Sequence, residues 1–157
     1  VLADVVRLIK GDRYRSRLIS KIMFGAYNKH IKNVRTVNDW LTRDEAVVDE
    51  YNAGKLTTFM FTVNGYRGLM NMILYVRKPR NIERIPKNLP MLMISGLDDP
   101  VGEYGKGVYR AYNSYHGHID DIDLRLYEDC RHELCNELNK EEIYEEIYGW
   151  IMNHMSK

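Results

Sequence analysis

An aspartate and a histidine near the end of the chain are the residues whose types and surroundings best fit joint chemistry. Asp99 lies in the segment 89–101 (LPMLMISGLDDPV), and His132 lies in the segment 126–133 (LYEDCRHE). Each segment is predicted to be a buried strand followed by a loop that carries the residue. A histidine oriented by a carboxylate can take a proton from a nucleophile, which is the chemistry of a catalytic triad. We therefore predict that Asp99 and His132 are the acid and the base of a catalytic triad.

The third member, an activated nucleophile, is not found in the sequence. It would be expected on a sharp turn between a strand and a helix with the pattern G-x-S-x-G, and the chain contains no such pattern. None of the five serines is framed by glycines. Ser95 is near Asp99, but a serine at the end of the same strand would compete with the acid for one loop, so we reject it. The nucleophile is expected to lie outside these residues.

The elements that must position the pair are predicted in the order strand, helix, strand, helix. The apolar run Met91–Ile94 and the alternating segment Ile122–Tyr127 are short enough for buried strands. A helix is predicted over 102–116 between them, and a further helix follows the second strand. A parallel crossover of this kind is right-handed, so both strands end at the same edge of the sheet. The acid and the histidine are therefore expected to be neighbours.

The first part of the chain is predicted to be helical. The expected helices span 2–10, 15–24, 42–54 and 58–76, with an irregular connection over 26–41 that Trp40 anchors. The pattern T-x-x-E at 42–45 predicts that Thr42 caps the third helix. Three prolines between positions 79 and 90 mark the change to strand, which divides the chain into regions 1–80 and 81–157.

Two motifs resemble the α/β-hydrolase superfamily, and within it the monoacylglycerol lipase and lysophospholipase-like group. They are SGLDDPVG at 95–102 and RHELCNE at 131–137, the latter shortly after Tyr127. The resemblance covers nearly the whole chain, and it implies that Asp99 is the triad acid and His132 the triad histidine. It also implies that region 1–80 is a helical cap. The expected fold is a truncated α/β-hydrolase: a mostly helical cap followed by a β-α-β-α unit with parallel strands.

The resemblance further implies an activity. It is that of a serine hydrolase acting on carboxylic esters, most plausibly monoacylglycerols or lysophospholipids, with no metal or organic cofactor. Phe59, Phe61 and Val101 are predicted to contact the substrate. The N-terminal strands, the oxyanion-hole loop and the nucleophile elbow of the family are absent here, so the chain is interpreted as a fragment whose partner is the missing half of the core. By itself it is predicted to be inactive.

Other functions also fit parts of this sequence. The chain could be a non-catalytic helical binding module or an inactive remnant of a hydrolase, or a peptidase or other hydrolase on the same fold. The spacing Cys130-x-His132-x-x-Cys135 could suit zinc, but a fourth ligand and a paired C-x-x-C are lacking. A metal site is therefore not expected.

Charge and composition bound the partners. Lys and Arg number 23 against 22 Asp and Glu, so no strongly basic surface for nucleic acid is expected. The chain has no apolar run of about 18 residues, which predicts no transmembrane segment. Two cysteines are too few for a disulfide framework and fit a cytoplasmic location. The unpaired edge of the first predicted strand favours self-association.

Overall fold

The first half of the chain is helical and the second half alternates strands and helices. The computed structural model describes residues 2–155. The first half holds α1 (Leu2–Lys10), α2 (Arg17–Phe24), α3 (Glu45–Ala53), α4 (Val63–Val76) and α5 (Pro79–Ile82). The second half holds β1 (Met91–Gly96), α6 (Lys106–His116), β2 (Ile122–Tyr127), the short 3-10 helix η1 (Leu134–Asn136) and α7 (Lys140–Met155). This order confirms the predicted fold class, a helical region followed by a β-α-β-α unit.

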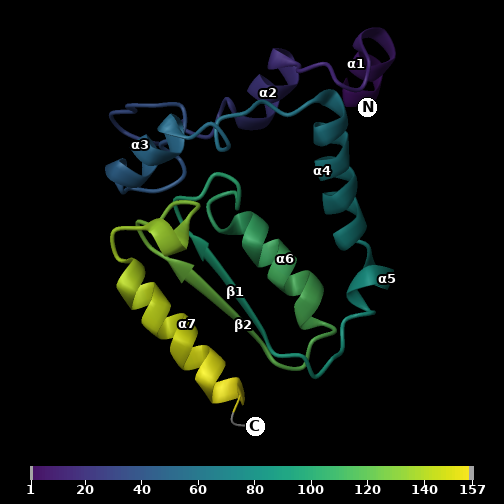
Figure 1. Ribbon diagram of the computed structural model, residues 1–157. Coiled ribbons are helices and arrows are strands. Elements are labelled where there is room, and N and C mark those ends of the chain that lie inside the picture. Colours follow the sequence, from purple (N-terminus) through teal and green to yellow (C-terminus); the bar gives the residue numbers. More distant parts are fainter. Residues whose placement is uncertain (1, 156–157) are drawn as a thin grey trace.

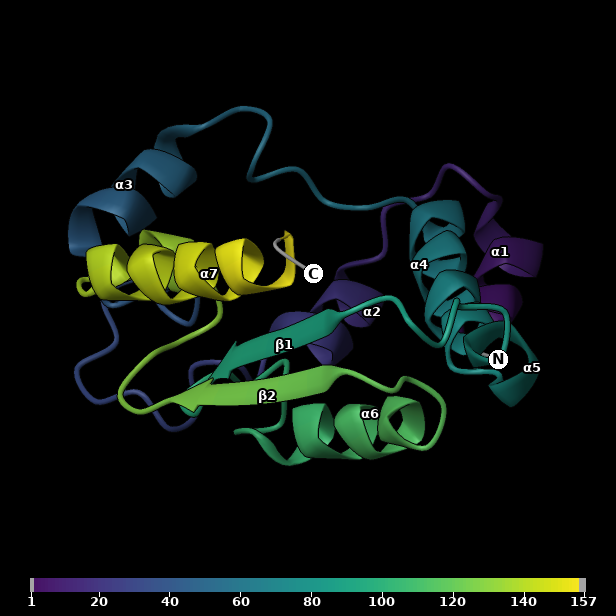
Figure 2. The ribbon, with the colours of Figure 1, turned by 90° about the horizontal axis from the view of Figure 1, so that it is seen from below.

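The two strands form a parallel pair, with Met91 opposite Ile122 and Gly96 opposite Tyr127. Helices α6 and α7 lie on opposite sides of this pair (Figures 1 and 2). Apolar side chains on both faces of a parallel sheet require such cover. On the side of α7, a core of Cys130, Leu134 and Ile143 is fully or almost fully buried. Because the strands are parallel, the loops that follow them start at the same end of the sheet.

The helical half has a small core of its own. Ile19 of α2 packs with Val63 and Tyr66 of α4, and all three side chains are at least 95% buried. Figure 1 shows α4 running from the end near α1 and α2 toward α5 and the start of β1. Within residues 2–155, no helix has the length and apolar character needed to cross a membrane.

The third helix begins two residues later than the pattern T-x-x-E predicts. Asp44 is the N-cap of α3, and its carboxylate accepts hydrogen bonds from the backbone N–H groups of Ala46 and Val47. The hydroxyl of Thr42 instead donates to the backbone oxygen of Asn136, at 2.8 Å. The prediction that Thr42 is the cap is wrong, because a contact with a residue 94 positions away holds the threonine outside the helix.

Three other helices are shorter than predicted, for local reasons. α2 starts at Arg17 rather than at 15, because Ser16 is its N-cap and accepts a hydrogen bond from the N–H of Ile19. α4 starts at Val63 rather than at 58, because Thr62 is its N-cap and accepts a hydrogen bond from the N–H of Gly65. α6 starts at Lys106 rather than at 102, because Glu103, Tyr104 and Gly105 all have positive φ angles of 52°, 56° and 82°. Left-handed residues cannot continue a right-handed helix, so these residues form a tight loop after the acid.

Candidate active site

Asp99 and His132 lie side by side at the end of the two strands. The distance from Asp99 Oδ2 to His132 Nδ1 is 3.1 Å. Asp99 follows β1 and is 95% buried, whereas the His132 side chain, on the loop after β2, keeps 38% of its surface exposed. The parallel strands bring these loops together, as the sequence analysis expects. A buried carboxylate beside a partly exposed imidazole is the arrangement in which histidine transfers protons and aspartate orients it.

The backbone around Asp99 fixes the direction of its carboxylate. The N–H of Val101 donates to Asp99 Oδ1 at 2.8 Å, which leaves Oδ2 to face the imidazole. The two loops are also joined to each other, because the N–H of Asp98 donates to the backbone oxygen of Cys130 at 2.9 Å. The acid is therefore held by its own turn and by the loop that carries the histidine.

The position of Asp99 sets the protonation chemistry of His132. A carboxylate oxygen can only accept, so in the neutral imidazole Nδ1 carries the proton and Nε2 carries the lone pair. The hydrogen bond to Asp99 and its negative charge raise the pKa of His132 above its ordinary value, against the effect of partial burial. Nε2 makes no hydrogen bond with any residue from 2 to 155. This nitrogen can act as a general base.

An aromatic residue of the helical half covers one side of the imidazole. The ring centroids of Trp40 and His132 are 5.1 Å apart, and Tyr27 packs edge-on against Trp40 at 4.8 Å. The N–H of His132 also points to the backbone oxygen of Trp40, at 3.5 Å. The segment before α3 thus forms part of the surroundings of the histidine.

An apolar cavity of about 680 Å³ has Trp40 in its lining. Its lining includes Trp40 together with Phe24, Phe59, Met60, Phe61 and Tyr66. Phe59 and Phe61, predicted to contact substrate, therefore line one cavity together with Trp40, whose ring packs beside His132. Val101 is not among the lining residues; it is 44% exposed and its backbone N–H binds Asp99. The structure separates Val101 from the other two.

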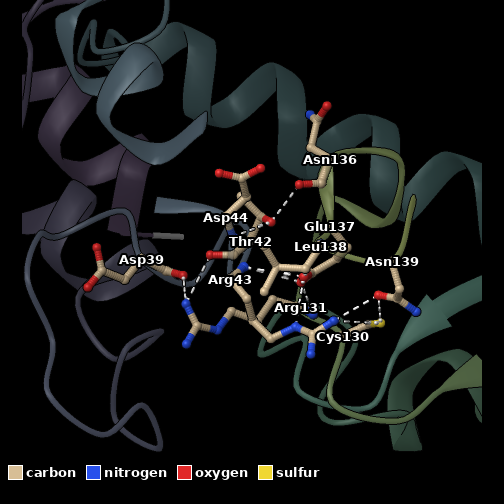
Figure 3. Close-up of polar contacts among 10 residues, drawn as sticks. All are labelled: Asp39, Thr42, Arg43, Asp44, Cys130, Arg131, Asn136, Glu137, Leu138 and Asn139. Carbon is tan, nitrogen blue, oxygen red and sulfur yellow. Dashed lines mark hydrogen bonds and ion pairs between the residues drawn. The ribbon is translucent and has the colours of Figure 1, made fainter. Parts of the chain in front are cut away.

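A set of charged residues that the sequence analysis gave no role supports the histidine loop (Figure 3). Glu137 has no exposed surface, and it accepts hydrogen bonds from the backbone N–H of Arg131 at 2.7 Å and from Arg43 Nε at 2.9 Å. The guanidinium of Arg131 donates to the backbone oxygens of Asp39 and Thr42. Arg131 and Glu137 belong to the RHELCNE motif. The ion pair between Glu137 and Arg43 joins residues 94 positions apart, so no local sequence pattern indicates it.

The zinc alternative finds no support in the geometry. Cys130 is buried and donates to Asn139 Oδ1 at 3.4 Å, while Cys135 is exposed. The described part of the chain has one group of three side chains that could together bind a metal ion, formed by Asp121, Asp123 and His154. The potential ligand atoms of these three residues lie within 4.8 Å of one another. This group lies at the start of β2, away from His132.

Comparison with known proteins decides the family. A family model described as "Serine aminopeptidase, S33" matches residues 8–139. The chain belongs to this S33 family of serine hydrolases. The resemblance to the α/β-hydrolase superfamily predicted from the two motifs is thereby confirmed. No curated protein sequence matches the chain.

Solved structures show the same fold as this S33-family chain. One is a highly thermostable carboxyl esterase from Bacillus coagulans in complex with glycerol, with 21% identity and a TM-score of 0.83. Another is a lipase in its open form, with 18% identity and a TM-score of 0.85. Each comparison covers 99% of this chain but only 50% and 51% of the other. The S33-family chain thus spans about half the length of these hydrolases.

Proposed function

We propose that this chain supplies the histidine and the acid of a Ser-His-Asp triad in a serine hydrolase that cleaves carboxylic esters. The observation that carries the proposal is the pairing of the buried Asp99 carboxylate with His132 Nδ1 at 3.1 Å. Membership of a serine hydrolase family and the esterase and lipase folds support it. The serine and the oxyanion donors would come from protein outside these residues.

The roles of the two residues follow from their geometry. Nε2 of His132 accepts the proton of the serine hydroxyl as that oxygen attacks the ester carbonyl. The resulting imidazolium is stabilised by Asp99, and it then gives the proton to the leaving alcohol. In the second half of the reaction the same nitrogen activates the water that releases the acid. Trp40 limits the directions from which these groups can approach the imidazole.

The cavity favours a lipid ester as substrate. A volume of about 680 Å³, lined by aromatic side chains and Met60 together with polar residues such as Asn52 and Thr58, can accommodate a flexible hydrocarbon chain. Trp40 belongs to the cavity and also packs beside His132, so the cavity and the imidazole share a neighbouring residue. We therefore propose a monoacylglycerol or a lysophospholipid as the substrate class.

A second candidate is cleavage of an amide, because the matching family model is described as a serine aminopeptidase. The triad residues would be the same. Assays of the protein on matched pairs of long-chain esters and aminoacyl amides separate the two candidates. We expect turnover of the esters; turnover of amides alone would favour the peptidase.

The experiment that tests the proposal compares two histidine variants in a form of the protein that contains a serine elbow. His132→Ala should lower the turnover of p-nitrophenyl esters by a factor on the order of 10⁶. His116→Ala changes an exposed histidine at the end of α6 and should leave turnover unchanged. Equal activity of the two variants would favour a non-catalytic role for the histidine. The 157-residue chain alone should show no turnover.

A further inference from the structure

Glu137 is a buried anion whose bonds reach both halves of the chain. Its side chain has no exposed surface. Removing a carboxylate from water is strongly unfavourable unless charge and hydrogen bonds compensate, so its partners are held firmly. The partners are the side chain and backbone of Arg43, from the segment before α3, and the backbone N–H of Arg131, from the loop after β2.

The shortest of these bonds ends one residue before the histidine. The N–H of Arg131 donates to Glu137 Oε1 at 2.7 Å, and Arg43 Nε donates to Oε2 at 2.9 Å. The two oxygens of one carboxylate thus fix two segments relative to each other. Arg43 is also anchored to Asn139, whose Oδ1 accepts from the guanidinium at 2.8 Å (Figure 3).

Both residues that flank His132 are bound to the same segment of the helical half, Arg131 through its side chain and Glu133 through its backbone. The guanidinium of Arg131 donates to the oxygens of Asp39 and Thr42 at 2.7 and 2.9 Å. On the other side of the histidine, the N–H of Glu133 donates to the oxygen of Leu41 at 2.7 Å. Trp40 lies within this segment, so the same bonds hold its ring against the imidazole.

We infer that Glu137, together with Arg43, is a positioning residue that fixes His132 between Asp99 and Trp40. The inference rests on the proposed function. Glu137 does not contact the imidazole; it acts through the backbone of Arg131. A shift of the loop by a fraction of an ångström would lengthen the bond from Nδ1 to Asp99 and change the distance to Trp40. Misplacement of a catalytic group by about 1 Å can lower a rate by a factor on the order of 10².

Glu137→Gln tests the inference because it keeps the volume of the side chain and removes its charge. One acceptor oxygen becomes an NH₂ group that faces donors, and the Arg43 guanidinium loses its counter-charge. The matched control is Glu142→Gln, the same change on the exposed first turn of α7. Both variants are compared with the unchanged protein by thermal unfolding, so that loss of fold is separated from loss of position.

Two measurements report on position rather than on stability. In the folded protein, an NMR titration follows the His132 imidazole, and we expect its raised pKa to fall toward the ordinary histidine value in Glu137→Gln but not in the control. In the ester assay, run on the form of the protein that contains a serine elbow, kcat should fall by about 10- to 100-fold. KM for a short ester should change little, because such an ester is too short to fill the apolar cavity that Trp40 lines.

The outcomes separate this inference from the proposed function. If His132→Ala abolishes turnover but a folded Glu137→Gln matches the control in both measurements, the positioning role is wrong and the proposed function stands. If His132→Ala leaves turnover intact, the proposed function fails, and the NMR titration still decides whether Glu137 positions the imidazole. Should Glu137→Gln not fold, the same measurements on Arg43→Lys decide, because that variant keeps the charge and loses the Nε bond.

Discussion

His132 is held on three sides by different kinds of contact. The Asp99 carboxylate lies at Nδ1, the Trp40 ring lies beside the imidazole, and the backbone N–H points to the oxygen of Trp40. The carboxylate favours the charged imidazolium, whereas partial burial opposes it, and the raised pKa shows that the carboxylate has the larger effect. The site thus favours the form of histidine that appears after proton transfer, which is what a triad acid must do.

The raised pKa of His132 predicts how activity depends on pH. The general base must be neutral, so kcat/KM should rise with pH and level off only above the raised pKa, which exceeds the ordinary value of about 6.5. The same shift also contributes to the free energy of unfolding. This contribution is fully present below the pKa that His132 has in the unfolded chain, and it is lost as pH rises through the pKa that His132 has in the folded chain. A pH profile of ester hydrolysis checks the rise; a midpoint below the ordinary histidine value would contradict it.

At the scale of elements, the β-α-β-α unit was predictable because its signals are local. Apolar runs of strand length and a crossover of fixed hand are enough to place Asp99 and His132 at one edge. The starts of α3 and α6 were not predictable. Thr42 is held by the distant Asn136, and Glu103 and Tyr104 adopt positive φ angles that residues other than glycine rarely show. For the same reason Arg43 and Glu137 carried no sequence signal as a pair.

The end of β1 requires a glycine because the loop that follows β2, which carries His132, passes directly over it. A Cβ added at Gly96 would collide with the backbone oxygens of Cys130 and Arg131. We expect Gly96→Ala to displace the histidine loop and to lower the free energy of unfolding by about 1–3 kcal/mol, as overpacking does. Denaturant unfolding measures this change.

Gly149→Ala in α7 is the matched control, because no atom lies within 4 Å of the added carbon. Alanine is the better residue inside a helix, so this variant should be more stable by about 0.5–1 kcal/mol. An unchanged free energy of unfolding in Gly96→Ala would mean that the loop has room to move away from β1.

At the scale of the whole molecule, the two halves meet where the loop after β2 contacts the segment 39–44. The polar contacts of Figure 3 join these segments. The sheet itself is small: among residues 2–155 it has two strands, so each strand has one edge without a strand beside it. The esterase and lipase structures with the same fold are about twice as long as this chain.

Unpaired strand edges predict that the chain alone associates with itself. Backbone N–H and C=O groups along the free edge of β1 can pair with a second strand, and two-stranded sheets are marginal in water. We expect the apparent mass from light scattering to rise with the concentration of the 157-residue chain. A constant monomer mass over a wide concentration range would show that the edge is protected.

The most direct test of the account is an NMR titration of the His132 imidazole in the unchanged chain and in Asp99→Asn. It needs no nucleophile and no substrate, so it examines the pairing of acid and base by itself. The account predicts a pKa above the ordinary histidine value that falls in Asp99→Asn, because the asparagine has no charge to stabilise the imidazolium. An identical pKa in the two proteins would contradict the pairing and the triad roles that depend on it.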